Sequence, residues 1–364
     1  MVREPAVRVR GSERIGIPMA PARLGLVGAS GYGGTEFLRL AAGHAGIDVA
    51  VVAASSRAGE RLRDVAPNLA DDRVLEPVAL DRLIGLDVVV LATPHGPSLE
   101  LAPALVAAGT RVIDLSGAFR LGAAEFAEWY GEVHPAPELA ADGAEAAVYG
   151  LTELNRDAIT DAALVANPGC YPTATLLALA PLSGLVEPGT VVVDAMSGTS
   201  GAGRSSSDRL SLSSASGDVV AYGAPRHRHT IEIEHALGRL ATPLGAIAFT
   251  PHLVPMPRGL LATASARLAS GVGPDDVQDA LVDRYRTEHF VEVLEPGTFP
   301  HTKALAGSNG CQLGAVVDPR TGRVIVSSAI DNLGKGAAGQ ALQNLNRMLG
   351  LDETSGLTAI GIHP

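Results

Sequence analysis

The first half of the chain alternates short apolar runs with helical stretches. From Ala22 onward the sequence predicts a strand, a glycine turn and a helix, and runs rich in Val and Leu recur at 47–57, 86–96 and 110–119. Helical stretches such as 97–108 separate these runs. Apolar runs without polar alternation, with helices between them, predict a parallel sheet that is covered on both faces.

The second half has a different pattern of predicted elements, in which longer strand-like segments lie between fewer helices. The final stretch, 334–350, predicts a helix with small residues on one face. The two halves together predict an α/β protein: a doubly wound Rossmann-type domain, then an α+β domain with a mainly antiparallel sheet. The strands expected in the second half are 190–198, 245–256, 259–269, 311–318 and 323–331, with a helix at 274–285.

The change in the pattern of predicted strands and helices sets the expected domain boundaries. A dinucleotide-binding domain is expected at 22–169, completed by the C-terminal helical segment 334–364, and a catalytic and dimerisation domain at 170–333. Residues 1–21 contain four arginines but no apolar segment of the kind a secretory signal needs. We therefore expect them to form an extension outside both domains.

Composition narrows the range of functions. The net charge of −11 over 364 residues argues against a nucleic-acid partner, because such partners select a basic surface. Two cysteines are too few for a disulfide framework or a zinc motif, so we expect a reducing, cytoplasmic location and no bound metal. No apolar run reaches the roughly 18 residues of a membrane span, so no membrane partner is expected.

The segment GASGYGG at 28–34 joins the first predicted strand to the first predicted helix. Gly28, Gly31 and Gly34 permit a tight turn in which backbone N–H groups face a phosphate at the helix N-terminus. The hydroxyl of Ser30 adds a donor. The spacing differs from G-x-G-x-x-G, so the glycine pattern alone is weak evidence for a dinucleotide site. Its position between a predicted strand and a predicted helix nevertheless favours a dinucleotide site over a merely structural turn.

The end of the second predicted strand bears on the choice of nicotinamide cofactor. An acidic residue there would bind a free ribose 2′-hydroxyl, but this chain has Ser55, Ser56 and Arg57. Two hydroxyls and a guanidinium suit a 2′-phosphate, which predicts NADP(H). A solvated loop is the alternative interpretation.

Cys170 follows the turn-forming Pro168 and Gly169, where an Ala- and Leu-rich helix begins. A thiol at a helix N-terminus is expected to have a lowered pKa and to act as a nucleophile. A buried, inert cysteine fits the same position equally well.

The segment Arg-His-Arg-His at 226–229 concentrates cations and imidazoles in an acidic chain, and Thr230 is the expected N-cap of the next helix. The cluster suits anionic-substrate binding and general acid–base work, although alone it also fits a solvated basic face. Together with Cys170 and the glycine loop, it predicts thiolate attack on an acyl phosphate and reduction of the thioester to an aldehyde.

A set of ordered motifs then matches a known family. The chain resembles the N-acetyl-gamma-glutamyl-phosphate reductases, enzymes of arginine biosynthesis related to aspartate-semialdehyde dehydrogenase, from about Arg23 to the C-terminal helix. NPGCYPT and HRHTIE are the specific motifs, since GASGYGG is shared with relatives. The matching motifs include GASGYGGTE, DLSGAFR (114–120), NPGCYPT (167–173), SGTSGAGR (197–204), HRHTIE (227–232) and DNLGKGAAGQALQN (331–344).

The resemblance implies a role for each site residue. Cys170 would form the thioester, with its own backbone N–H as an oxyanion donor. His227 or His229 would be the acid/base, with a slight preference for His227, and Arg228 and Arg120 would contact substrate. Residues implied to bind the cofactor are Gly28, Ser30, Gly31, Tyr32 and Gly33 at the pyrophosphate and Ser197, Gly198 and Asn332 near the nicotinamide. The family also implies a homo-oligomer, a dimer or a tetramer, formed through the sheet of the second domain.

The chain departs from the family pattern at three places. Met196 stands where relatives often carry Lys, which is expected to alter substrate or cofactor contacts. Ile231 replaces a Pro that suits a helix start, at little expected cost. Gly117 and Ala118 replace bulkier or acidic residues, which leaves the role of Arg120 less defined.

Other functions fit parts of the pattern. The same chemistry could act on an aminoadipyl phosphate attached to a carrier protein in lysine biosynthesis, which would require a basic docking surface outside the pocket. An aspartyl-phosphate reductase agrees less well with HRHTIE and NPGCYPT. A dinucleotide-binding protein without catalysis is disfavoured, because both a nucleophile and a base are present.

Overall fold

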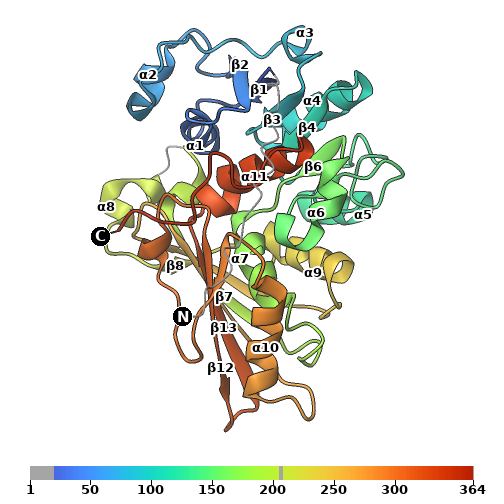
Figure 1. Cartoon of the computed structure of the whole chain (residues 1–364), viewed down its shortest axis with the longest axis vertical. Helices are drawn as coiled ribbons and strands as arrows, with labels where there is room; N and C mark the ends of the chain where they lie inside the picture. The colour runs from blue at the N-terminus through green and yellow to red at the C-terminus, as the bar shows by residue number, and fades with distance from the viewer. Residues whose placement is uncertain (1–19, 205–207, 364) are drawn as a thin grey trace, which may run out of the picture.

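The computed structural model describes residues 20–204 and 208–363, so the extension predicted at 1–21 lies almost entirely outside the described residues. Figure 1 shows two units stacked along the long axis of the molecule, with the early blue and cyan elements in one and the long strands of the other below them. Helix α11 (Gly339–Met348), drawn in red near the C-terminus, returns to the first unit.

The first unit is built on a parallel sheet. In the described part of the chain, six strands lie in the order β2-β1-β3-β4-β6-β5, and every neighbouring pair is parallel. The chain crosses to opposite sides of β1 when it forms β2 and β3, which opens a crevice at the carboxyl ends of these strands. The bounds are β1 (Ala22–Val27), β2 (Ile47–Ala53), β3 (Val88–Leu91), β4 (Arg111–Asp114), β5 (Val148–Tyr149) and β6 (Leu164–Ala166).

Helices cover both faces of this sheet. The apolar side chains form one cluster around Phe37 and Leu342 and another around Leu105 and Phe126, so each face has its own core. Because Leu342 belongs to α11, the C-terminal helix completes the core of the N-terminal unit. The other helices are α1 (Tyr32–Ala41), α4 (His95–Ala107), α5 (Ala123–Tyr130) and α6 (Thr152–Thr160), with short turns α2 (Leu62–Val65), η1 (Pro67–Leu69) and α3 (Leu80–Leu83).

The second unit is built on a mixed sheet. Counting only described residues, seven strands lie in the order β11-β12-β13-β10-β7-β9-β8, with four antiparallel pairs and two parallel ones. The strands are β7 (Val192–Gly198), β8 (Val220–Ala221), β9 (Ala248–Val254), β10 (Leu260–Arg267), β11 (Val291–Val293), β12 (Cys311–Asp318) and β13 (Arg323–Ile330).

One face of the second sheet is covered and the other is open. Helices α7 (Cys170–Leu179), α9 (Arg228–Leu240) and α10 (Pro274–Tyr285) pack on the covered face, against buried residues of β10 such as Leu260. Val192 and Met196 of β7 point to the other face, and each is 40% exposed. The remaining turns are η2 (Thr199–Ala202), η3 (Asp208–Leu210), α8 (Leu212–Ala215), η4 (Thr302–Leu305) and η5 (Gly334–Ala338).

The predicted fold class is confirmed, and several element bounds agree closely. The predicted helix at 274–285 and the predicted strand at 311–318 have the observed bounds of α10 and β12. The predicted C-terminal helix is instead a π-helical turn, η5, followed by α11. Strands β5 and β6 were not predicted, because strands of two and three residues are too short to form a recognisable apolar run.

Candidate active site

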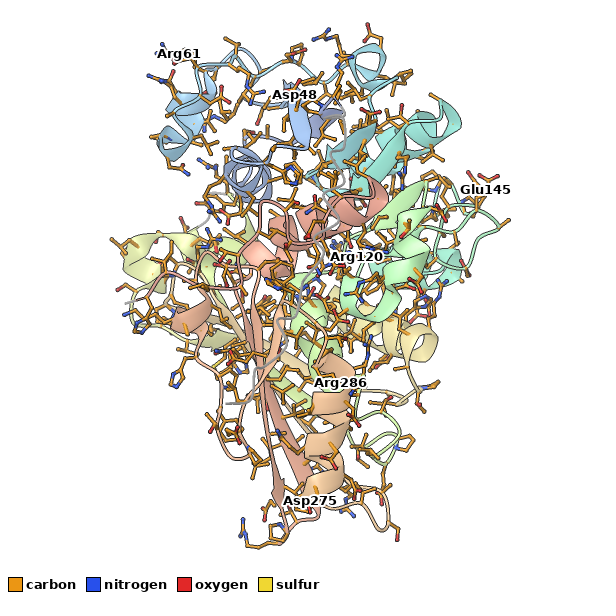
Figure 2. All side chains as sticks on the ribbon, in the orientation of Figure 1. Asp48, Arg61, Arg120, Glu145, Asp275 and Arg286 are labelled. Atoms are coloured by element: carbon orange, nitrogen blue, oxygen red, sulfur yellow. The ribbon has the colours of Figure 1, made fainter. Side chains whose placement is uncertain are left out.

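A cavity of about 1320 Å³ lies between the two units, and every site residue predicted from the sequence lines it. The fold therefore brings Arg57 of the first unit together with Cys170 and Asn332. Arg120 also lines the cavity, although it is only 6% exposed. Figure 2 shows Arg120 in the interior of the molecule, whereas Arg61 and Asp275 lie near its opposite ends.

The glycine loop forms one end of the cavity, between β1 and α1. Gly28 has a φ of +86°, and a Cβ at this position would collide with the backbone carbonyl of Ala92. Gly31 is the N-cap of α1 and has no side chain with which to cap it. The first N–H groups of the helix therefore have no side-chain cap and remain available to an anion.

Ser55, Ser56 and Arg57 follow β2 and line the same end of the cavity. The Arg57 guanidinium forms an ion pair with Glu60, whose Oε2 lies 2.7 Å from Nη2.

Ser197, Gly198 and Asn332 lie at the junction of the two units. Asn332 accepts a hydrogen bond from the Gly259 N–H (2.8 Å) and donates one from Nδ2 to the Ser200 hydroxyl (2.9 Å), which fixes its amide. Met196 is not among the residues that line the cavity, because its side chain lies on the open face of the sheet. The alternation of a strand accounts for this, because its neighbour Ser197 points the opposite way.

Cys170 is the first residue of α7, with Gly169 as the N-cap, and its side chain is half-buried. Its Cβ packs against Gly336 of the π-helical turn, where any side chain would clash. Burial raises the pKa of the Cys170 thiol to about 11, against the opposing effects of the Tyr171 N–H and of Arg120. The predicted lowering of this pKa is thus wrong for the free protein, and the thiol needs a base.

The two histidines differ in how they are held. His227, rather than Thr230, is the N-cap of α9, and its Nδ1 accepts the His229 N–H at 3.1 Å. The helix therefore begins at Arg228, earlier than predicted. Burial, followed by the charge of Arg228, lowers the pKa of His227 to about 4, and burial holds the pKa of His229 well below its usual value.

His229 lies directly against the loop that carries the cysteine. A Cβ on Gly169 would come within 2.5 Å of the His229 Nε2, so the imidazole is in contact with the residue that precedes Cys170. The same nitrogen is 3.9 Å from Oε2 of Glu232. His229 Nδ1 is buried and has no partner among the described residues.

Glu232 is the central residue of this cluster, and the sequence reading missed its role. Its carboxylate accepts hydrogen bonds from the Gly169 N–H (2.8 Å), the Tyr149 hydroxyl (2.9 Å) and Arg120 Nη1 (3.0 Å). Glu232 is only 2% exposed. The available signal was the i,i+3 spacing from His229 within HRHTIE, which places both side chains on one helix face.

Arg120 and Arg228 are held very differently. Arg120 donates from Nε to the Asn167 carbonyl, from Nη2 to the Leu115 carbonyl and from Nη1 to Glu232. Each of its three nitrogens is therefore engaged within the protein. The Arg228 guanidinium stacks on the Tyr130 ring at 4.3 Å and makes no hydrogen bond or ion pair with any described residue.

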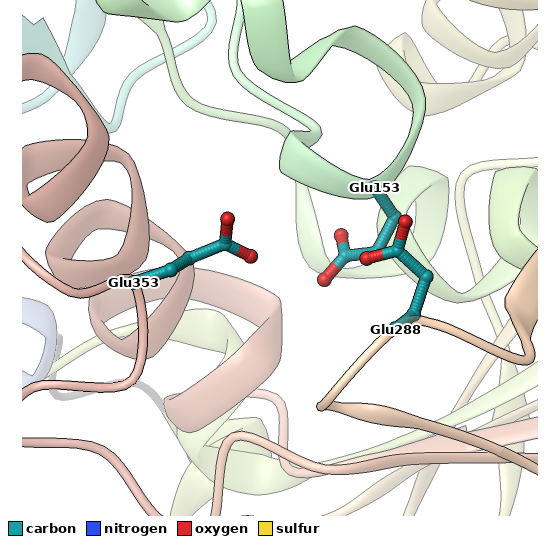
Figure 3. Close-up of side chains that lie close together, drawn as sticks. All are labelled: Glu153, Glu288 and Glu353. Carbon is teal, nitrogen blue, oxygen red and sulfur yellow. The ribbon is translucent and has the colours of Figure 1, made fainter. Parts of the chain in front are cut away.

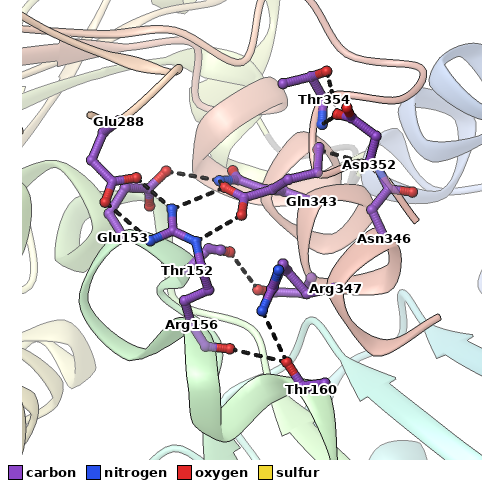
Figure 4. A network of polar contacts seen from close by, with 12 residues as sticks. Thr152, Glu153, Arg156, Thr160, Glu288, Gln343, Asn346, Arg347, Asp352 and Thr354 are labelled. Atoms are coloured by element: carbon purple, nitrogen blue, oxygen red, sulfur yellow. Dashed lines mark hydrogen bonds and ion pairs between the residues drawn. The ribbon is translucent and has the colours of Figure 1, made fainter. Parts of the chain in front are cut away.

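A second buried polar cluster lies outside the cavity. Glu153, Glu288 and Glu353 point toward one another with oxygen atoms within 4.8 Å, which by distance alone could hold a metal ion (Figure 3). Arg156, however, pairs with Glu288 at 2.5 Å (Figure 4). It also pairs with Glu353 at 2.8 Å. Lys335, fully buried, pairs with Glu153 at 2.5 Å. Arg284, whose Nη1 lies 3.7 Å from Glu288, adds a third cation. Three cations therefore face the three carboxylates, and we assign no metal site.

The helices within 20–204 and 208–363 include none with the length and apolar character needed to span a bilayer.

Two family models match the chain, and together they cover most of it. A semialdehyde dehydrogenase NAD binding domain matches residues 23–162, and a semialdehyde dehydrogenase dimerisation domain matches residues 170–332. The break between the two matches falls just before Cys170.

Similar curated proteins share nearly the full length. N-acetyl-gamma-glutamyl-phosphate reductase of Desulforudis audaxviator is 48% identical over 348 residues, which cover 94% of this chain and 99% of that protein. The protein of that name from Synechocystis is 45% identical, again over 94% of this chain and 99% of the relative.

Solved structures confirm the fold at lower identity. Aspartate semialdehyde dehydrogenase II of Vibrio cholerae, complexed with ASA, superimposes with a TM-score of 0.69 at 16% identity, covering 91% of this chain and 99% of that one. The Candida albicans aspartate semialdehyde dehydrogenase, solved with NADP, has a TM-score of 0.63 at 16% identity, over 91% of this chain and 99% of that one.

Proposed function

The chain belongs to the N-acetyl-gamma-glutamyl-phosphate reductase family of semialdehyde dehydrogenases, and from this we infer its reaction. It catalyses the NADPH-dependent reduction of N-acetyl-gamma-glutamyl phosphate to N-acetylglutamate 5-semialdehyde and phosphate, in arginine biosynthesis. The observation that carries the assignment is the meeting, in one cavity, of Cys170, His229 and the glycine loop.

The cavity fits NADP(H) along its length. Gly28, Ser30, Gly31, Tyr32 and Gly33 would hold the pyrophosphate at the uncapped start of α1, and Ser55, Ser56 and Arg57 would hold the 2′-phosphate. Ser197, Gly198 and Asn332 would contact the nicotinamide end. NADPH, when bound, supplies the hydride that reduces the acyl thioester.

Cys170 and His229 carry the covalent chemistry in our assignment. His229 accepts the thiol proton, and the thiolate attacks the acyl carbon of the substrate. The bond to the phosphate oxygen then breaks, phosphate leaves with the electron pair, and a thioester to Cys170 remains. After reduction, the carbonyl re-forms, the carbon–sulfur bond breaks, and His229 returns the proton to the sulfur.

The geometry favours His229 over His227 as the base. His229 touches Gly169 and has a buried carboxylate nearby, whereas Nδ1 of His227 is occupied by capping α9. A neutral imidazole can accept a proton, and burial keeps both rings neutral near pH 7. Glu232 would then stabilise the imidazolium that forms on His229.

Glu232 and Arg120 act on the cysteine loop as positioning residues. Glu232 binds the N–H of Gly169, and Arg120 binds the carbonyl of Asn167, so the two fix the turn from both sides. The N–H of Cys170 at the start of α7 is our candidate oxyanion donor.

The family's dimerisation domain makes the chain a homo-oligomer, and we propose a tetramer assembled through the second sheet. The open face of that sheet, with exposed Val192 and Met196, supports this arrangement. We also propose a cytoplasmic location, which two unpaired cysteines favour.

The test is phosphate-dependent reduction of NADP by the purified protein with N-acetylglutamate semialdehyde, run in reverse because acyl phosphates hydrolyse readily. Aspartate semialdehyde is the matched control. We expect a strong preference for the acetylated aldehyde. Turnover of only the aspartyl substrate, or of neither, would reject the assignment and revive the carrier-bound aminoadipyl or non-catalytic alternative.

A further inference from the structure

Gly117 and Tyr130 fit together at the wall of the cavity. A Cβ on Gly117 would collide with the hydroxyl oxygen of Tyr130, and both residues line the cavity. The hydroxyl therefore occupies the space that a side chain at position 117 would otherwise fill. Gly117 is also one of the positions at which this chain departs from the family pattern.

The Tyr130 ring is held on several sides, so its hydroxyl cannot easily move away. Phe126 stacks on it with centroids 4.4 Å apart, and His95 meets it edge-on at 5.3 Å. The guanidinium of Arg228 lies 4.3 Å from its centroid. Such packing fixes the ring and sets where the hydroxyl points.

Two hydrogen-bond donors at this wall lack partners within the described part of the chain. Among the residues that the structure describes, neither the Tyr130 hydroxyl nor the Arg228 guanidinium donates a hydrogen bond, whereas the nitrogens of Arg120 are engaged. Burial raises the pKa of Tyr130, so its hydroxyl remains a donor across the working range of pH. A cation and a phenol side by side, both unsatisfied, are the chemistry that recognises an oxyanion.

We propose that Tyr130 and Arg228 together bind an oxyanion of the substrate, and that Gly117 determines this specificity by leaving room for the Tyr130 hydroxyl. The inference rests on the proposed function, because its ligand is the acyl phosphate or its products. The oxyanion is either the phosphate or the carboxylate of the amino-acid part, and the reverse reaction presents these on separate molecules.

The test is steady-state kinetics in the reverse direction for Tyr130→Phe, Gly117→Ala and the double variant, with phosphate and N-acetylglutamate semialdehyde varied separately. We expect the KM of one of the two to rise about tenfold in each single variant, with kcat changed little. A rise for phosphate assigns the pair to the phosphoryl group, and a rise for the aldehyde assigns it to the carboxylate. The double variant should match Tyr130→Phe, since both changes remove the same contact.

Two matched controls separate this role from general damage. Gly184→Ala adds a methyl group where the glycine has nothing within 4 Å, and Tyr285→Phe removes a hydroxyl that binds the Leu177 carbonyl away from the cavity. Both should keep wild-type KM values. Unchanged KM values in Tyr130→Phe, or additive effects in the double variant, would overturn the inference.

A binding readout makes the result independent of turnover. Calorimetric titration of the NADP-loaded protein with inorganic phosphate, and separately with N-acetylglutamate, should show weaker binding of one of them in Tyr130→Phe. If the wild type fails to turn over but this loss is seen, the proposed function falls and the oxyanion site stands. If turnover is normal and both affinities are unchanged, only the oxyanion site falls.

Discussion

Two buried carboxylates, Glu232 and Glu153, belong to polar clusters that reach Cys170 through neighbouring residues. Glu232 binds the N–H of Gly169, and Glu153 pairs with Lys335, the neighbour of the Gly336 that packs on the cysteine. Their surroundings differ. The Glu232 cluster opens on the cavity through His229 and Arg120, whereas the Glu153 cluster lies outside it.

The difference shows that burial and ion pairing do not by themselves identify a catalytic site. Both clusters contain short charge-assisted contacts between elements distant in sequence, and both would be costly to break. Only the first presents an imidazole and a thiol to a ligand-sized cavity. We therefore expect mutations of the first to change turnover and mutations of the second to change stability.

The largest effect should come from Cys170→Ser. Turnover should fall by about 10⁴-fold or more, because a hydroxyl is a far weaker nucleophile here, while Tm and NADPH binding stay close to wild type. Cys311→Ser, at the other cysteine, is the matched control and should keep its activity, since Cys311 is buried in β12 away from the cavity. Substantial turnover in Cys170→Ser would exclude the thioester route.

Glu153→Gln should lower the stability of the protein and leave its turnover nearly unchanged. It leaves the buried Lys335 without its charge partner and should lower the free energy of unfolding by about 3–5 kcal/mol, measured by chemical denaturation. Specific activity of the remaining folded protein should stay within a few-fold of wild type. A loss of kcat at unchanged stability would show that Glu153 acts in catalysis, and the distinction between the two clusters would then be wrong.

Glu232→Gln should lower kcat by about 100-fold while the protein remains folded. Removing the carboxylate also destabilises the imidazolium, so the acid limb of the kcat profile should shift to lower pH. Glu232→Asp should recover part of the activity. A drop in kcat without a shift of the acid limb would show that Glu232 positions the loop before Cys170 but does not stabilise the imidazolium of His229.

Arg57→Asp should act only at the cofactor end of the same cavity. We expect the KM for NADPH to rise about tenfold or more and the KM for NADH to change little, since only NADPH carries the 2′-phosphate. Glu60→Gln, which frees Arg57 from its ion pair, is the control and should keep the preference for NADPH. Equal losses for both cofactors would refute the 2′-phosphate role.

The smallest effect concerns stability on the acid side. The pKa of His227 falls from 6.5 to about 4 on folding, so the unfolded chain binds more protons between these values, and stability should rise with pH across about 4 to 6.5. His227→Asn should make that rise less steep in pH-dependent thermal melts, and the remainder is expected from His229, whose pKa burial also lowers. An unchanged slope would show that other groups set the acid sensitivity.

Much of the site could be predicted from the sequence because its residues fall in local motifs. The glycine loop, Cys170 at a helix start and the Arg-His-Arg-His segment can each be recognised from their neighbours in the chain. Glu232 lay within such a motif yet was missed, because its partners Tyr149 and Gly169 come from other segments. The pKa of Cys170 was predicted in the wrong direction, since burial depends on packing as well as on helix position.

The sequence by itself determined the fold class, the family and the reaction, because periodicity and short motifs are properties of neighbouring residues. Only the tertiary structure decided which groups face one another. It set His229 against Gly169 and left the Arg228 guanidinium beside Tyr130 with no hydrogen-bond partner among the described residues. Those outcomes depend on the packing of segments far apart along the chain, for which no local pattern carries a signal.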